Sequence, residues 1–178
     1  PIKNVYLVYT IEEKHSAEVI ATLRRVFDGR EKDFAGILIY VHPAGIPGEA
    51  IGAGAANRTW GAKHAVGDLR SQGENLRNFV FSTFDADHVL HQEFLGRLTH
   101  LYLTSDKRDH KFFQSAVALF DNNYWEVPVF MRIEATAVAL GGLAEWSVGG
   151  KLKDTFSAYS SSLQTLLDAD FWDVSLGV

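Results

Sequence analysis

The sequence predicts an α/β fold with a mostly parallel sheet flanked by helices. Short apolar, β-branched segments alternate along the chain with longer segments whose apolar residues recur at helical spacing, an order typical of parallel strands joined by helices. Of the 178 residues, 47% are hydrophobic and 22% are charged, which is the balance of a globular protein. We therefore expect a single domain over residues 1–178.

The first half of the chain supplies two strands and two helices. "VYLVYT" (5–10) and "GILIYVH" (36–42) have the β-branched and aromatic composition of strands. The segment between them, "SAEVIATLRRVF" (16–27), has the apolar spacing of a helix. A loop rich in turn formers (43–54) then leads into "AANRTWGAKHAVGDL" (55–69), which predicts a second helix.

The second half continues this alternation. "NFVFST" (78–83) predicts a third strand, "QEFLGRLTHLYL" (92–103) a helix, and "FFQSAVALF" (112–120) a fourth strand. The tail holds a short extended piece, "FSAY" (156–159), and a helix that starts within "SSSLQTLL" (160–167). Strands and helices in this order favour a parallel sheet covered on both faces.

The most apolar run, Val127–Gly150, predicts a long helix that ends near Trp146. Arg132, Glu134 and Glu145 interrupt this run, and charges in the middle of a bilayer are costly. We therefore expect a buried or interfacial helix rather than a membrane span.

Charge and cysteine content narrow the function classes. The formal net charge of -5 argues against a nucleic-acid-binding protein, which usually presents a basic face. The absence of cysteine excludes disulfides and thiolate metal sites, and it fits a reducing compartment. Because the opening residues also lack a signal-peptide pattern, we expect a location in the cytoplasm or at the cytoplasmic face of a membrane.

The strongest chemical signal follows the third predicted strand. Asp85 and Asp87 stand one residue apart at its carboxyl end, where open α/β sheets bind their ligands. A turn that begins at Phe84 would keep both carboxylates on the exposed rim. Oxygen ligands in such a position suit Mg²⁺ or Mn²⁺, which bind phosphate oxygens at the same time. In the simpler interpretation, Asp85 caps a turn and Asp87 is a solvated neighbour.

Two histidines open a different interpretation. If a helix followed directly, Asp87 and His91 would lie one turn apart, and a zinc hydrolase could use that spacing. No third ligand follows at a recognisable distance, so an exposed turn with two incidental histidines is the simpler account. A metal-dependent phosphoesterase using Asp85, Asp87, His88 and His91 is one alternative function, and a non-catalytic carbohydrate- or protein-binding module is another.

The order of the motifs resembles one enzyme family. "GAGAANRTWGAKHAV" precedes a strand that ends in "DAD", and a helix, "FFQSAVALFDNN" and an arginine within a long helix ending in "EW" follow. In this order the chain is similar to the family-two glycosyltransferases over nearly its whole length. The resemblance implies a GT-A-like fold, in which a nucleotide-sugar donor is bound with Mg²⁺ or Mn²⁺. It also implies transfer of the sugar to a glycan or lipid-linked acceptor.

The resemblance assigns donor-side roles to five residues. Asp85 would contact the nucleotide, and Asp85 and Asp87 would hold the metal on the diphosphate. Glu12 or Glu13 would stand in place of the acidic residue that touches the uracil. Asn57 lies on the helix that follows the family's glycine-rich loop.

Acceptor-side candidates lie in the fourth predicted strand and the loop after it, where the family places its acceptor surface. They are Gln114, Asn122, Asn123, Tyr124 and Trp125. The flat apolar face of Trp125 matches the C–H face of a pyranose, although a tryptophan that leads into a helix is as often a core anchor.

The chain departs from the family pattern in the strand and loop that precede the Asp pair. The family's opening strand, with its Pro-x-Tyr-Asn-Glu-like turn, has no counterpart, and residues 3–14 resemble the second strand. The family's Gly-Lys-Gly pattern reads Gly52-Ala53-Gly54, so the basic contact to the donor is either missing or supplied by Arg58 or Lys63.

The family's catalytic base, in a Glu-Asp-type motif, would be due after Val178. Asp168, Asp170 and Asp173 come earlier, and we expect them at loop and helix-end positions. The chain is thus expected to be an internal piece of a membrane-associated parent, without its first strand and C-terminal part. We expect no turnover from residues 1–178 alone.

Overall fold

The structure, a computed structural model, describes residues 2–50, 54–114, 123–148 and 158–176. The chain divides into two compact units. The first comprises Pro1–Asn78 and Leu166–Val178, and the second comprises Phe79–Thr165. The expectation of a single domain stays a prediction.

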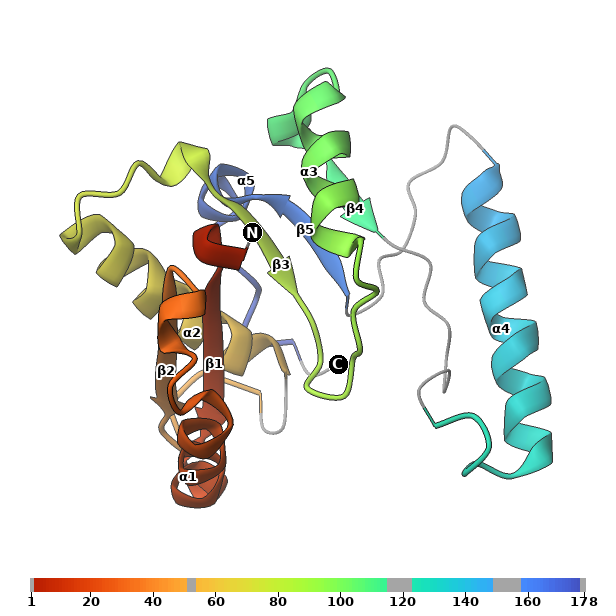
Figure 1. Ribbon diagram of the computed structural model, residues 1–178, viewed down its shortest axis with the longest axis horizontal. Coiled ribbons are helices and arrows are strands. Elements are labelled where there is room, and N and C mark those ends of the chain that lie inside the picture. Colours follow the sequence, from red (N-terminus) through yellow and green to blue (C-terminus); the bar gives the residue numbers. More distant parts are fainter. Residues whose placement is uncertain (1, 51–53, 115–122, 149–157, 177–178) are drawn as a thin grey trace. The chain divides into compact units, whose positions relative to one another are not determined.

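The first unit is built on two parallel strands, β1 (Tyr6–Glu12) and β2 (Gly36–His42). Tyr6 lies opposite Gly36, and the register continues to Glu12 opposite His42. Helix α1 (Ser16–Phe27) connects the two strands, as a crossover between parallel strands requires (Figure 1). The parallel pairing and the positions of these elements confirm the sequence prediction for this part of the chain.

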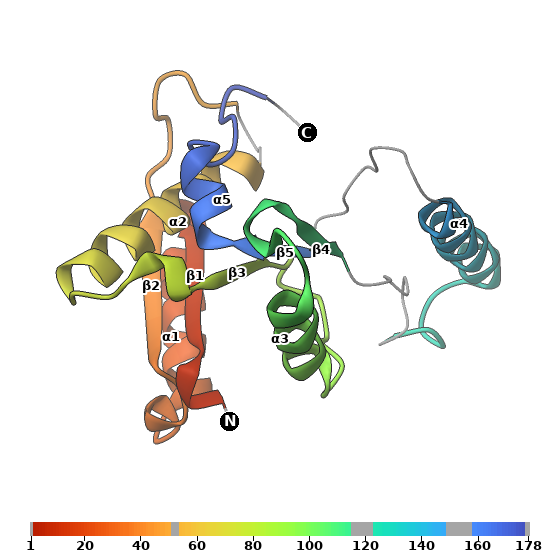
Figure 2. The ribbon, with the colours of Figure 1, turned by 90° about the horizontal axis from the view of Figure 1, so that it is seen from above.

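Helices lie on opposite faces of this two-stranded sheet. The Tyr9 ring points toward α1, where its centroid lies 5.9 Å from that of Phe27. The next residue, Thr10, points to the other face. There it meets Gly61 of α2 (Gly54–Ser71), where an added Cβ would lie only 1.7 Å from the Thr10 hydroxyl oxygen. Figure 2 shows both helices beside the strands. The apolar core of this unit includes Ile11, Ala55, Ala56, Ala65, Val66 and Leu69.

The second unit contains a three-stranded antiparallel sheet in the order β3-β5-β4. Its strands are β3 (Val80–Thr83), β4 (Phe112–Gln114) and β5 (Tyr159–Ser162). Helix α3 (Phe94–Thr104) buries Leu98 and Tyr102, and the Tyr102 ring lies 5.9 Å from that of Phe113.

The central strand of this sheet corrects two expectations. Ser160–Ser162 were expected to begin a helix, but they form β5, and α5 (Leu163–Asp168) starts only after them. Because β5 pairs antiparallel with both β3 and β4, the described residues do not form the single, mostly parallel sheet that the sequence predicted. The α/β class itself is confirmed.

The polar side chains of β5 are satisfied inside the unit. Ser160, Ser161 and Ser162 are fully buried. The Ser160 hydroxyl lies 2.7 Å from that of Ser82, and the Ser162 hydroxyl accepts a hydrogen bond from the Gln164 backbone at 3.2 Å. Burial of a hydroxyl costs little when it is hydrogen-bonded, so this polar strand is compatible with an interior position.

The long helix expected after Val127 is α4 (Val129–Ser147), which follows Pro128. Ala135 is buried, but Phe130 and Ile133 are more than two-thirds exposed, so the helix is not buried on all sides by the described residues. None of the helices in the described ranges combines the length and the apolar character that crossing a bilayer requires.

Some predicted features lie outside the described residues. They are Gly52, Ala53, Asn122, residues 115–120 of the fourth predicted strand and residues 156–157 of the extended piece in the tail.

Candidate functional site

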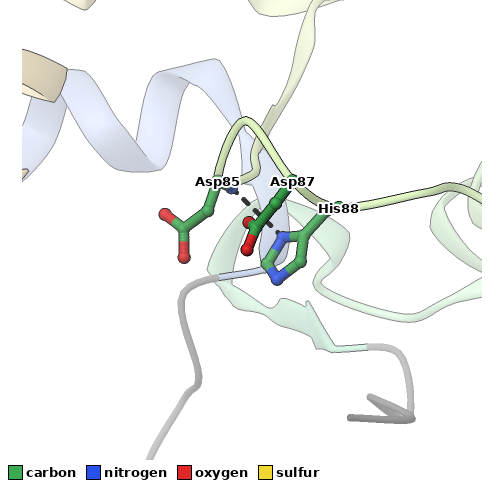
Figure 3. A group of neighbouring side chains, drawn as sticks. All are labelled: Asp85, Asp87 and His88. Carbon is green, nitrogen blue, oxygen red and sulfur yellow. Dashed lines mark hydrogen bonds between the residues drawn. The ribbon is translucent and has the colours of Figure 1, made fainter. Parts of the chain in front are cut away.

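The turn that follows β3 positions the acidic pair. The strand ends at Thr83, and both Asp85 and Asp87 are exposed. The backbone N–H of His88 donates to the carbonyl oxygen of Asp85 at 3.1 Å, which closes the turn. The backbone N–H of Asp85 in return donates to Nδ1 of His88 at 3.1 Å (Figure 3). These two hydrogen bonds hold the three side chains on one short loop.

The geometry of this loop fits a divalent ion. One ligand atom from each of Asp85, Asp87 and His88 lies within 4.8 Å of the others. Mg²⁺ binds oxygen at about 2.0–2.1 Å, so two ligands on opposite sides of one ion are about 4.2 Å apart. Small side-chain rotations would therefore place both carboxylates on a single ion. The expectation that Asp85 and Asp87 lie together on an exposed rim is met.

His88 orients the turn in this arrangement. In a neutral imidazole one nitrogen donates and the other accepts, and Nδ1 accepts from Asp85. Nε2 then carries the proton and has no lone pair for a metal. For Nε2 to bind an ion, the proton would have to move to Nδ1 and the bond to the Asp85 backbone would break. The carboxylates are therefore the better ligands.

His91 does not join this group. Residues 84–93 form no helix, since α3 begins at Phe94, so Asp87 and His91 do not have the one-turn spacing that the zinc-hydrolase alternative requires, and the simpler account of an exposed turn holds. Nδ1 of His91 instead accepts from the Glu93 backbone N–H at 3.3 Å. The constellation considered for a phosphoesterase thus lacks its second histidine.

The donor-side residues of the first unit lie around the end of β1. Glu12 is exposed, while Oε2 of Glu13 accepts from the backbone N–H of Ala44 at 3.0 Å. Nδ2 of Asn57 donates to the Thr10 carbonyl at 3.1 Å, and its buried Oδ1 has no hydrogen-bond partner among the described residues. Glu13 therefore holds the loop after β2, and Asn57 ties α2 to β1. Their role toward a nucleotide stays a prediction.

The two basic residues that could replace the family's lysine are engaged within the first unit. Nζ of Lys63 lies 5.4 Å from the centroid of the Phe171 ring, a cation–π contact. The guanidinium of Arg58 packs against Gly54, with Cζ 3.7 Å from the position that a Cβ would take there. Neither observation tests the expected contact with the donor.

A buried ionisable pair at the carboxyl end of β2 was missed in the sequence. Nε2 of His42 lies 3.0 Å from Oε2 of Glu49, at an angle outside hydrogen-bond geometry. The side chains are only 11% and 16% exposed, and the Trp60 ring lies 5.3 Å from the imidazole. His42 is the last residue of a predicted strand, and open α/β sheets bind their ligands at that end of the strands. This position could have identified His42 as a candidate from the sequence.

The acceptor candidates differ in how free their side chains are. Nε2 of Gln114 donates to the Ala158 carbonyl at 2.6 Å, which ties the end of β4 to the start of β5. Trp125 is 83% exposed, so it is not a core anchor in the described structure. Only Trp125 of this pair presents an open surface.

Comparison with other proteins adds no family. The chain matches no protein family model, and no match was found among the curated proteins or the solved structures. Any function must therefore be argued from the residues and their geometry.

The three aspartates near the C-terminus occupy the loop and helix-end positions expected for them. Asp168 is the last residue of α5, and Asp170 has a positive φ of 53°. Oδ1 of Asp173 accepts from both the backbone N–H and the hydroxyl of Ser175, and these hydrogen bonds lower the pKa of Asp173. Asp173 thus stabilises a local turn.

Proposed function

We propose that this chain is a glycosyltransferase-type domain that binds a nucleotide-diphosphate-sugar donor through a divalent metal held by Asp85 and Asp87. The convergence of these two carboxylates on one exposed turn at the carboxyl end of β3 supports the proposal most directly. The order of motifs along the sequence supports it as well. The relation to GT-A-like proteins that the order of motifs implies is part of the same proposal.

Each residue has a defined task in this proposal. Asp85 and Asp87 supply oxygen ligands, and His88 keeps the turn in shape through its bond to the Asp85 backbone. A bound Mg²⁺ or Mn²⁺ would offset the negative charge of the diphosphate. The proposal concerns the donor side of the reaction and assigns no base for the acceptor hydroxyl. Metal-dependent donor binding is therefore the activity to measure.

The decisive experiment is calorimetric titration of residues 1–178 with uridine diphosphate, with and without Mn²⁺. We expect binding that requires the metal and that weakens at least tenfold in Asp87→Asn, because one anionic ligand is lost. Asp106→Asn removes another exposed carboxylate and serves as the matched control. Equal binding with and without Mn²⁺, or no binding at all, would contradict the proposal.

The role of His88 can be separated in the same titration. As an orienting residue, His88 should tolerate replacement by glutamine with a change in Mn²⁺ affinity of threefold or less. A loss of tenfold or more, together with a reduced preference for Mn²⁺ over Mg²⁺, would instead identify the imidazole as a ligand.

A further inference from the structure

A second group of side chains surrounds the start of α4. Cζ of Arg132 lies 5.3 Å from the centroid of the Tyr124 ring and 5.1 Å from that of Trp125. The two rings are 5.2 Å apart and nearly perpendicular. The Arg132 backbone N–H donates to the Pro128 carbonyl at 3.2 Å, so Arg132 lies in the first turn of α4. We call these three residues the Trp125 cluster.

The cation in this cluster has no anionic partner among the described residues. Arg132 makes no ion pair there, and its Nε is buried without a hydrogen-bond partner. Glu134 is two residues further along α4 and therefore points about 160° away around the helix. A guanidinium that stacks on aromatic rings keeps the N–H groups in its own plane available for an acceptor. The cluster therefore offers an unused cationic donor.

The indole beside this cation is open to solvent. Trp125 is 83% exposed. A flat apolar ring of this kind matches the C–H face of a pyranose, and an arginine recognises a carboxylate with two parallel hydrogen bonds. One guanidinium carries a single positive charge, so it balances one carboxylate but only part of the charge of a doubly charged phosphate.

We infer that the Trp125 cluster binds an acidic sugar, with the pyranose ring against Trp125 and its carboxylate on Arg132. The inference rests on the proposed glycosyltransferase function, for which the sequence places Trp125 on the acceptor side, and it names the acceptor as a glycan that contains uronic acid. A neutral sugar could stack on the indole and accept hydrogen bonds from the guanidinium, but it would not balance the positive charge of Arg132.

Tetragalacturonic acid and its methyl ester provide a matched pair of ligands with the same sugar rings, of which only the acid carries carboxylate charges. We expect the acid to bind to residues 1–178 at least tenfold more tightly than the ester. Arg132→Gln should remove this preference, and Trp125→Ala should weaken the binding of both ligands. Arg97→Gln removes an exposed arginine from α3 and is the control, for which the preference should persist.

Equal affinity for acid and ester, or no binding of either, would overturn the inference, as would loss of the preference in Arg97→Gln. The titrations are run with a chelator and without nucleotide, so they do not depend on Asp85 and Asp87. If uridine diphosphate and Mn²⁺ bind but the acidic glycan does not, only this inference fails. If the glycan binds and the nucleotide does not, the proposed donor site fails instead.

Discussion

The strands of the two small sheets carry opposite kinds of side chain, apolar in the first unit and polar in the central strand of the second. In the first unit, β2 reads "GILIYVH" and pairs with an equally apolar β1 between two helices. In the second unit, the central strand β5 ends in three serines, all of them fully buried. Burial therefore does not require an apolar sequence where strands pair on both sides and each hydroxyl finds a partner.

In both units a small residue makes a close contact with a strand. Gly61 lets α2 approach Thr10 of β1, and Ser160 meets Ser82 across the strands of the other sheet. The contact of Gly61 with Thr10 depends on the space that glycine leaves, whereas the contact of Ser160 with Ser82 depends on a hydrogen bond. Substitutions at these positions separate the two possibilities.

The largest effect is expected at Gly61. An alanine Cβ would lie 1.7 Å from the Thr10 hydroxyl oxygen and 3.0 Å from its Cβ, so rotating the hydroxyl away does not remove the conflict. Overpacking costs about 1–3 kcal/mol, and the better helix propensity of alanine returns up to about 1 kcal/mol. Because 1.7 Å is a severe overlap, the upper end of this cost applies, and Gly61→Ala should lower the free energy of unfolding by about 2 kcal/mol, measured by urea denaturation.

Gly67 on the same helix is the control for this change, because a Cβ there would meet nothing within 4 Å. Gly67→Ala should be neutral or stabilise the protein by up to about 1 kcal/mol. If the two alanine variants were equally stable, the close approach of α2 to β1 would not limit packing in the first unit.

A smaller effect is expected in the serine strand. Ser160→Ala leaves the Ser82 hydroxyl without its partner at 2.7 Å and should cost about 1 kcal/mol. The double variant Ser82→Ala/Ser160→Ala removes both polar groups and should recover part of this loss. Additive losses in the double variant, measured by the same denaturation, would show that the hydroxyl pair contributes no coupling.

The smallest effect concerns the dependence of stability on pH. The Tyr102 hydroxyl donates to Oδ1 of Asp109 at 2.5 Å, and this hydrogen bond holds the pKa of Asp109 below its ordinary value of 3.8. The stabilisation is therefore complete above the unfolded pKa and is lost as the pH falls through the lower folded value. Wild type should lose more stability than Asp109→Asn between about pH 5 and pH 2.

This difference is read from denaturation midpoints at each pH, with Tyr102→Phe as a second variant that keeps the carboxyl group. Both variants should show a flatter acid limb than the wild type. A limb as steep as that of the wild type in Tyr102→Phe would mean that another contact of Asp109 sets its pKa.

Apolar patterning was sufficient to predict the first unit and the helices of the second. Residues 16–27 and 36–42 form a helix and a strand with the bounds that the sequence predicted. Patterning failed at Ser160–Ser162, because serine has no strong strand preference and its burial depends on partners far away in the chain.

The candidate site divides in the same way. The pairing of Asp85 with Asp87 follows from their position just after a strand, so the sequence alone predicted it. The bond from the Asp85 backbone to His88 depends on how the turn closes, and the His42–Glu49 pair depends on the path of a loop. Such contacts have no periodic signal in the sequence.

The order β3-β5-β4 also has a consequence for biosynthesis. The middle strand is the last to be translated, so neither β3 nor β4 has its partner until Tyr159–Ser162 has emerged from the ribosome. At a translation rate of about 5–20 residues per second, β3 and β4 remain unpaired for several seconds. During that interval a nascent chain would expose two unpaired strands to chaperones and to neighbouring chains, and the arrival of three serines would end the exposure.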